Sequence, residues 1–463
     1  MFSKEIYIAR RNRLIKEVGK GIILLLGNSE APCNYPGNTY KFRQDSSFLY
    51  FIGLNEPDLA AIFDTENGEE ILFGNNVDID DIIWMGPQPS ISDKAAKTGI
   101  AKSEPFKNLS EYISDAIAKG RKIHFLPPYR NYNKILLNEL LNIPISDLKI
   151  NASVDLIKAV VAQRIIKDKY EIEEIDKACN IGYAMHYASM KLAKVGMKEQ
   201  ELVGVMEGIA HSQGAMVSFA TILSQNGETL HNHNHSQILT DGRLFVMDAG
   251  AETNMNYCSD FTRTLPSGGK FTQRQKEIYA IVEKANNYAQ SIAKPGITYK
   301  DVHLAASKII VEGLKALGII KGDVDEAVEA GVQALFMPHG LGHNMGLDVH
   351  DMEDLGENYV GYDDNHIRSK QFGLASLRMG RELMPGHVIT DEPGIYFIPA
   401  LIEKWKNENI NTSFLNFDKL KSYYDFGGIR LEDDILITTD GCRYLGAKRL
   451  PISISDIEET MRK

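Results

Sequence analysis

The sequence contains few cysteines, no long hydrophobic run and no excess of basic residues. Its four cysteines are scattered and form no Cys-x-x-Cys pair, which excludes a zinc ribbon and a disulfide framework. The longest early apolar run, residues 22–26, is too short to cross a bilayer and predicts a buried strand. The net charge of −11 argues against nucleic-acid binding, which needs a basic face. Because the first residues lack a basic segment followed by an apolar one, we expect a cytoplasmic protein without a signal peptide or membrane anchor.

The length of 463 residues exceeds one ordinary core, so two domains are expected. The first part alternates helical and strand-like patterns, which is typical of an α/β domain, and Asn67-Gly68 predicts a hairpin turn. A boundary is expected near residues 155–170, where a basic stretch leads into a long amphipathic helix. The strands of the first part are expected over residues 21–26, 48–52, 60–63, 70–73 and 122–126.

The second part combines long helices with short strands. Thr272 and Gln275 form a capping-box pattern at the start of one helix. Other helices are expected over residues 168–193, 198–213 and 299–317, and strands over 244–248, 257–264, 388–396 and 429–438. The segments 356–384 and 400–426 have few periodic apolar positions, so loops or insertions are expected there.

Two aspartates, Asp248 and Asp260, each lie within an apolar, strand-like run. With a turn around Asn254, the two runs would form an antiparallel hairpin in which these aspartates face each other. Two buried carboxylates that face each other at side-chain contact repel, so they need a shared proton or a cation. The pair therefore indicates a site that binds a cation.

Two glutamates repeat the pattern of an acid within an apolar strand. Glu392 ends one such run, and Glu432 lies within another. Arg430 and Glu432 are two positions apart and share one face of a strand, so Arg430 can hold a neighbouring carboxylate in place. Asp433 and Asp434 follow directly, and a solvated edge is the expected place for them.

Three histidines, His339, His343 and His350, lie within twelve residues of a glycine-rich segment. The spacing of His339 and His343 matches that of a helical zinc-binding pair, but Gly340 and Gly342 disfavour a helix, and the glutamate of that motif is absent. A glycine-rich loop that presents three histidines is therefore predicted. A second tract has histidines at alternate positions, which predicts one face of a strand and leaves adventitious metal binding open: His231, His233 and His235.

Together these residues predict a site for two metal ions. Two divalent cations would neutralise the four negative charges of Asp248, Asp260, Glu392 and Glu432. With one imidazole, this oxygen-rich ligand set suits Mn²⁺, Co²⁺, Fe²⁺ or Zn²⁺ rather than a thiolate zinc site. Two metals roughly 3.5–4 Å apart are the arrangement used for hydrolysis, with a bridging water that becomes hydroxide near neutral pH.

At these residues the sequence resembles the aminopeptidase P and prolidase family. The resemblance extends over about residues 160–445, and residues 42–57 resemble the first domain of the family. It implies an α/β N-terminal domain of the creatinase and aminopeptidase P type over residues 1–163, and an α+β pita-bread catalytic domain over residues 164–463. The motifs that carry it are Asp-Ala-Gly-x-Glu at 248–252, Ser-Asp-x-Thr-Arg-Thr at 259–264, His-Gly-Leu-Gly-His at 339–343, Leu-Asp-Val-His-Asp at 347–351, Glu-Pro-Gly-Ile-Tyr at 392–396 and Gly-Ile-Arg-Leu-Glu-Asp at 428–433.

The resemblance also implies a role for each site residue. Two divalent ions, with Mn²⁺ expected first and Co²⁺ or Zn²⁺ as alternatives, would be held by Asp248, Asp260, His343, Glu392 and Glu432. The catalytic residues would be His231, His339, His350, Glu392, which shuttles a proton, and Arg430. Phe219 and Arg378 would bind substrate, and Phe219 stands where a tyrosine is often found.

Two further departures from the family pattern concern spacing and histidine content. Asp248 and Asp260 are twelve positions apart, one more than usual in the family, and a bulge in the hairpin would absorb the extra residue. His233 and His235 are an unusual addition to the tract that contains the family's substrate-contacting histidine.

The family resemblance implies cleavage of the bond between an N-terminal residue and a following proline. The segment around Trp84 resembles an aminopeptidase P segment that reaches a neighbouring subunit, although a core tryptophan is the alternative. Arg378 resembles a prolidase arginine that would clamp the carboxylate of a dipeptide. A Xaa-Pro aminopeptidase is therefore expected, as a dimer or tetramer acting on peptides with proline at the second position. The alternatives are a Xaa-Pro dipeptidase, a non-catalytic pita-bread binding module and a metal-free creatinase-like hydrolase.

Overall fold

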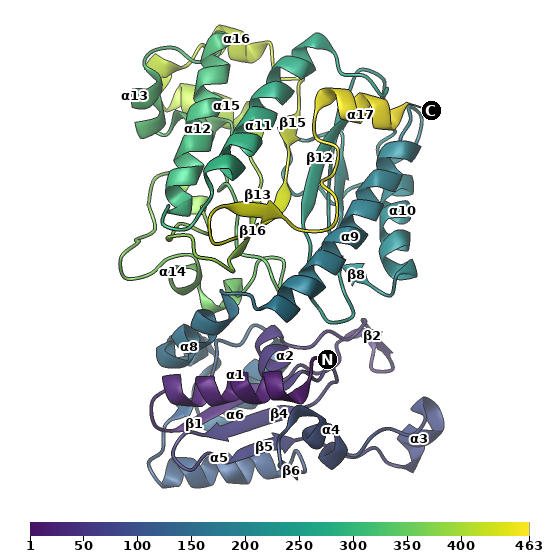
Figure 1. Cartoon of the computed structure of the whole chain (residues 1–463), viewed down its shortest axis with the longest axis vertical. Helices are drawn as coiled ribbons and strands as arrows, with labels where there is room; N and C mark the ends of the chain where they lie inside the picture. The colour runs from purple at the N-terminus through teal and green to yellow at the C-terminus, as the bar shows by residue number, and fades with distance from the viewer. Residues whose placement is uncertain (463) are drawn as a thin grey trace. The chain divides into compact units, whose positions relative to one another are not determined.

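Figure 1 shows a computed structural model of the chain, which describes residues 1–462. The chain divides into two compact units. The first contains Met1–Arg164 and Asp354–Tyr359, and the second contains the rest of the described residues. Among the described helices, none is both long and apolar enough to span a membrane.

The first unit is built on a five-stranded sheet in the order β6-β5-β4-β1-β7. The apolar run Ile22–Leu26 forms strand β1, an inner strand that is antiparallel to β4 and parallel to β7. It is buried along most of its length, as the prediction of a buried strand requires. Asn67-Gly68 connects β4 and β5 as an antiparallel hairpin, which confirms the predicted turn. The other strands are β4 (Ala60–Asp64), β5 (Glu70–Phe73), β6 (Lys102–Glu104) and β7 (Ile123–His124), with β2 (Pro32–Tyr35) and β3 (Asn38–Thr39) paired separately.

One strand predicted in this unit is wrong, because residues 48–52 lie in helix α2 (Ser46–Ile52). The Asp45 side chain accepts a hydrogen bond from the Phe48 backbone N–H and caps the helix, while Gly53 ends it in the left-handed conformation. Every residue of α2 is buried, so its sequence carries no amphipathic period. The other helices are α1 (Lys4–Glu17), α3 (Ile79–Met85), α4 (Ile91–Thr98), α5 (Asn108–Ala118), α6 (Asn131–Leu141), α7 (Leu148–Asn151) and α8 (Val154–Arg164).

Trp84 lies on α3 and is 86% exposed. Ile79, Ile83 and Met85 of the same short helix are also largely exposed. The alternative of a core tryptophan is therefore wrong.

The second unit contains the long helices that the sequence predicts. Asp168 caps α9 (Lys169–Leu192) by accepting from the backbone N–H of Glu171, and Thr272 caps α11 (Gln273–Ile292) by accepting from that of Gln275. Figure 1 shows α9 next to α10 (Glu199–Ser212) and α11 next to α12 (Tyr299–Ala316). The shorter helices are α13 (Val324–Glu329), α14 (Glu357–Val360), which overlaps the first unit, α15 (Pro399–Asn407), α16 (Phe417–Lys421) and α17 (Ile454–Met461).

The strands of the second unit form small antiparallel sheets that meet around the site. One sheet has the order β12-β10-β9 and another the order β13-β16-β17, while β14 pairs with β15 and β11 with β8. The strands are β8 (Met216–Val217), β9 (Ile222–Ser224), β10 (Leu244–Ala249), β11 (Ala251–Glu252), β12 (Phe261–Pro266), β13 (Val388–Asp391), β14 (Gly394–Tyr396), β15 (Gly428–Arg430), β16 (Asp433–Ile437) and β17 (Cys442–Tyr444).

Two predicted strands are each broken into two. Residues 388–396 form β13 and β14, with Glu392 and Pro393 between them, and residues 429–438 contain β15 and β16, with Leu431 and Glu432 between them. Pro393 has no N–H to donate to a ladder, which favours the first break. The Leu431 N–H donates to the Pro393 carbonyl, so the two breaks lie side by side. Each break carries one of the two glutamates predicted for the site.

Two further expectations need correction. The segment 400–426 contains helices α15 and α16, because Pro399 is favourable in the first helical turn and Asn416 caps α16 through the Lys419 N–H. The strand expected from residue 257 begins at Phe261. Before it, Cys258 forms only an isolated bridge with Glu252, and the Asp260 N–H donates to the Asp434 side chain instead of to a partner strand.

Candidate active site

The β10–β12 hairpin carries the two aspartates of the site. Asp248 pairs with Thr262 across the ladder, and the same register continues to the bridge between Glu252 and Cys258. The prediction that Asp248 faces Asp260 directly is therefore wrong, and so is the predicted bulge. Asp260 is the diagonal neighbour of Asp248, and the period of two places both side chains on the same face.

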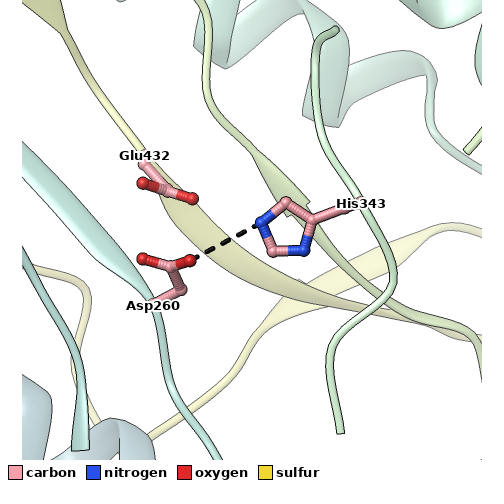
Figure 2. Close-up of side chains that lie close together, drawn as sticks. All are labelled: Asp260, His343 and Glu432. Carbon is pink, nitrogen blue, oxygen red and sulfur yellow. Dashed lines mark ion pairs between the residues drawn. The ribbon is translucent and has the colours of Figure 1, made fainter. Parts of the chain in front are cut away.

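Three ligand groups from distant parts of the sequence converge at this face. Asp260 lies just before β12, Glu432 lies between β15 and β16, and His343 comes from the glycine-rich loop (Figure 2). One ligand atom from each lies within 4.8 Å of the others. His343 Nε2 is 3.5 Å from Asp260 Oδ2 and 3.7 Å from Glu392 Oε1. An imidazole and three carboxylates thus point at one small volume.

The loop that carries His343 fixes the orientation of its ring. His343 Nδ1 lies 3.0 Å from the Asn344 carbonyl oxygen, to which it donates, so Nε2 faces the carboxylates. The His343 backbone N–H donates to Thr390 Oγ1. A Cβ at Gly342 would lie 2.0 Å from the Thr390 carbonyl oxygen, so the close packing of this loop requires glycine. Residues 339–350 contain no helix, as predicted.

Arg430 connects Asp248 with two neutral hydroxyl groups. Its Nη2 is 2.5 Å from Asp248 Oδ2, its Nε donates to Thr262 Oγ1 and its Nη1 donates to the Tyr396 hydroxyl. Thr262 Oγ1 in turn donates to Glu432 Oε2 over 2.7 Å. Burial disfavours the charge of Arg430, but Tyr396 and Asp248 outweigh that effect and raise its pKa. Through these bonds Arg430 and Thr262 fix the orientations of the Asp248 and Glu432 carboxylates.

Burial makes the carboxylates of the site hard to ionise without a cation. It raises the pKa of Asp260, Glu432 and Glu392, and repulsion from neighbouring carboxylates raises each further. One oxygen of Asp248 and one of Asp260 are buried and accept no hydrogen bond. Hard divalent cations bind such oxygens together with an imidazole nitrogen, so this donor set fits the predicted metals.

Asp433 and Asp434 do not lie at a solvated edge, so that prediction is wrong. Both are 1% exposed. Asp433 binds the guanidinium groups of Arg263 and Arg449 at 2.6 and 2.8 Å. Asp434 Oδ2 accepts the backbone N–H of Asp260, and thus positions the loop that carries a site carboxylate.

All residues predicted for the site line one cavity of about 680 Å³. Four carboxylates and Arg430 form its polar part, and Phe219 and Ile222 contribute apolar surface. The predicted residues in the lining are Phe219, His231, Asp248, Asp260, His339, His343, His350, Arg378, Glu392, Arg430 and Glu432.

His339 contacts a tyrosine that the sequence analysis did not single out. His339 Nε2 lies 2.9 Å from the Tyr396 hydroxyl, and its Nδ1 lies 2.8 Å from the Gly340 carbonyl oxygen. Burial, together with the charge of Arg430, lowers the pKa of His339 to about 3, so the ring is neutral. Tyr396 lies on β14, 57 positions from His339, so no local pattern of the sequence indicates this contact.

His350 and Arg378 share a carboxylate partner that was also missed, Glu353. Glu353 Oε2 is 2.7 Å from His350 Nδ1, and Oε1 is 2.7 Å from Arg378 Nη1. The hydrogen bond from His350 and the charge of Arg378 lower the pKa of Glu353 to about 2. The His350 ring packs against the His343 ring, with 4.1 Å between their centroids.

The histidine tract forms a loop, so the predicted strand over residues 231–235 is wrong. The side chain of Asn232 accepts the Asn234 N–H, and such turns replace the hydrogen bonds of a ladder. His231 and His233 line the cavity, whereas His235 Nδ1 lies 3.0 Å from the Leu223 carbonyl oxygen.

The sequence matches two protein families. Metallopeptidase family M24 matches residues 173–439, and the aminopeptidase P N-terminal domain matches residues 7–124. A protein of Fusarium vanettenii named probable Xaa-Pro aminopeptidase is 34% identical over 420 residues, which cover 90% of this chain and 87% of that protein. The human Xaa-Pro dipeptidase is 32% identical over 477 residues, which cover 98% of this chain and 93% of that protein.

Solved structures of bacterial enzymes are similar over almost the whole chain. Zinc-substituted aminopeptidase P of E. coli, in complex with product, is 29% identical with a TM-score of 0.81, and the match covers 100% of this chain and 99% of that one. The aminopeptidase PepP of Pseudomonas aeruginosa is 26% identical with a TM-score of 0.80, covering 99% and 98%. These matches confirm the predicted fold class, an α/β N-terminal domain followed by a pita-bread catalytic domain.

Proposed function

Because the chain belongs to metallopeptidase family M24, we propose that it is a Xaa-Pro aminopeptidase, which cleaves the bond between an N-terminal residue and a penultimate proline. The observation that carries the proposal is the convergence of four carboxylates and His343 in one cavity with the three other histidines of the predicted site. The carboxylates argue against a metal-free hydrolase and against a non-catalytic module, neither of which needs them. The proposal includes a cytoplasmic location and a homo-oligomer, which stay predictions.

The proposed ligands of two divalent cations are Asp248, Asp260, His343, Glu392 and Glu432. The unpartnered oxygens of Asp248 and Asp260 and the inward-facing Nε2 of His343 support this assignment. When bound, such cations polarise a substrate carbonyl and acidify water. Manganese is our proposal for the native metal, with cobalt or zinc as alternatives.

Other side chains would handle the substrate and its proton. Glu392 Oε2 lies 3.7 Å from His339 Nδ1, and burial raises the pKa of Glu392, which suits a group that takes up and returns a proton. We assign hydrogen bonds with the scissile peptide group to His339 and His350, and substrate contact at the mouth of the cavity to His231. Arg430 would keep Asp248 in place, since it binds that carboxylate directly.

The preference for proline has a physical basis in the missing N–H of the imide. A site that offers no acceptor at that position accepts proline without leaving a buried polar group unpaired. Phe219 is half-buried in the cavity lining and would supply an apolar wall for the substrate.

A Xaa-Pro dipeptidase is the second candidate, because Arg378 lines the cavity and could bind the carboxylate of a dipeptide. The decisive experiment strips the protein of metal, adds Mn²⁺, Co²⁺ or Zn²⁺, and compares hydrolysis of Xaa-Pro and Xaa-Pro-Yaa peptides. We expect metal-dependent release of the first residue, with tripeptides preferred. Absence of hydrolysis with every metal would refute the peptidase assignment, and a preference for dipeptides would establish the second candidate.

A further inference from the structure

The carboxylate of Glu353 binds two residues of the cavity wall, and no part of the proposed reaction uses it. One of its oxygens is 2.7 Å from Arg378 Nη1 and the other is 2.7 Å from His350 Nδ1. Arg378 and His350 line the catalytic cavity, whereas Glu353 contacts both of them without lining it. The guanidinium predicted to bind a substrate carboxylate therefore already binds a carboxylate of the chain.

A single side chain, His350, lies between Arg378 and the proposed metal ligand His343. Arg378 Nη1 is 3.0 Å from His350 Nδ1, and the His350 ring packs against the ring of His343. One imidazole thus separates the guanidinium from a proposed metal ligand. In a Xaa-Pro dipeptide the free carboxylate follows the scissile bond within one residue, and consecutive Cα atoms are about 3.8 Å apart.

We propose that Glu353 determines specificity by occupying Arg378 in place of the free carboxylate of a dipeptide. This inference rests on the proposed function and assigns the enzyme to tripeptides and longer peptides. A dipeptide carboxylate would have to displace Glu353 from the guanidinium and would meet a like charge beside it. A longer peptide presents a neutral amide at the same point, so it meets no such repulsion.

The exposure of the pair sets the size of the effect. The Glu353 side chain is 44% exposed and the Arg378 side chain 33% exposed, so water screens part of their interaction. We therefore expect removal of the Glu353 charge to improve the use of a dipeptide by up to about fivefold rather than by several orders of magnitude.

The test measures kcat and KM for Ala-Pro and Ala-Pro-Ala with the full-length, Mn²⁺-loaded protein and its Glu353→Gln variant. Glutamine keeps the length and the hydrogen-bonding oxygen, so it can still accept a bond from His350. We expect the ratio of kcat/KM for the dipeptide to that for the tripeptide to rise by about fivefold, mainly through a lower KM for Ala-Pro.

Two variants serve as controls. Asp363 binds His366 at 2.7 Å and Arg381 at 3.3 Å, a similar trio that does not line the cavity, so Asp363→Asn leaves the ratio unchanged. In an Arg378→Gln background, Glu353→Gln has no guanidinium to release, so it no longer favours the dipeptide.

The outcomes separate this inference from the function on which it rests. If the wild-type protein cleaves neither peptide with any metal, the proposed function fails. If it cleaves Ala-Pro-Ala but Glu353→Gln leaves the ratio within twofold of wild type, the role of Glu353 is refuted while the peptidase assignment stands. A wild-type protein that already uses Ala-Pro as well as Ala-Pro-Ala also overturns the role of Glu353.

Discussion

Two neighbouring carboxylates of the second unit, Glu432 and Asp433, are buried to the same extent but differ in their partners. Asp433 binds two arginines, Arg263 and Arg449, within 2.8 Å. Glu432 accepts a hydrogen bond from the neutral hydroxyl of Thr262 and faces other carboxylates. The first acid has its counter-charge within the chain, whereas the second needs one from outside.

The pKa shifts of the two residues show the consequence of this difference. Burial opposes the charge of Asp433, but Arg263 and Arg449 outweigh burial and lower its pKa. Burial raises the pKa of Glu432, and Asp260 and Glu392 raise it further. Removing a buried acid from its internal arginine destabilises the fold, whereas a buried acid that faces other acids is available to bind a cation.

The largest expected effect is a loss of activity without a loss of stability when Glu432 is replaced. Glu432→Gln removes a proposed metal ligand, so we expect kcat/KM for a Xaa-Pro-Yaa peptide to fall by about 10³-fold or more. The metal-free variant should unfold at the same temperature as the wild type or higher, since a like charge is lost. Activity near the wild-type level, after stripping and re-addition of Mn²⁺, would remove Glu432 from the site.

The adjacent substitution should have the opposite effect. Asp433→Asn leaves the buried guanidinium of Arg263 without its carboxylate, so we expect a loss of about 3–5 kcal/mol in the free energy of unfolding. Denaturant unfolding in EDTA measures this loss. Asp425→Asn is the control, because Asp425 pairs with Arg274 at 2.6 Å on the surface, where its side chain is 74% exposed. Equal stability of both variants would contradict the distinction between the two kinds of carboxylate.

Arg430 provides a sharper test, because it is a counter-charge within the chain for a proposed metal ligand, Asp248. Arg430→Lys keeps the charge but cannot reach Asp248, Thr262 and Tyr396 together. We expect the affinity for Mn²⁺ to fall by about 10–100-fold, measured by calorimetry. An unchanged dissociation constant would show that Asp248 needs no such support.

The most gradual expected effect concerns pH, because it is spread over several pH units. The folded-state pKa values of Asp260 and Glu432 are raised, so their contribution to stability is complete below the unfolded value of about 4 and is lost as pH rises through the folded value. The metal-free protein should therefore lose up to about 1.4 kcal/mol per pH unit for each group above pH 4, while bound Mn²⁺ removes this loss. Thermal unfolding in EDTA checks this prediction, and identical pH slopes for wild type and Glu432→Gln would contradict it.

The sequence was sufficient to identify the acids and histidines that line the cavity, because each interrupts an apolar run or a glycine-rich loop. It could not supply the register of the β10–β12 hairpin. A turn centred on Met255 instead of Asn254 pairs Asp248 with Thr262 instead of Asp260. Because the pairing then shifts by two residues, the same side chains face the core in both registers, and the apolar pattern does not distinguish them. It also missed the strand breaks at Glu392 and Glu432, because an apolar run lies on each side of the break and the two runs were interpreted as one strand. Pro393 was a visible signal for the first of these breaks.

Partners that depend on long-range contacts were not predictable. Asp434 reaches the backbone of Asp260 across 174 positions, and no local pattern indicates that bond. Glu353 lies in a segment with no apolar period, so its contact with Arg378 follows only from the fold. By contrast, the capping aspartate of α2, Asp45, was visible in the sequence, but the apolar residues after it were interpreted as a strand.

The central claim is that five side chains of this chain supply the ligands for two divalent cations. Anomalous diffraction at the manganese edge, from crystals of the full-length protein grown with Mn²⁺, tests it most directly. The account predicts two peaks in contact with Asp248, Asp260, His343, Glu392 and Glu432. A map with no peak among these side chains would contradict it.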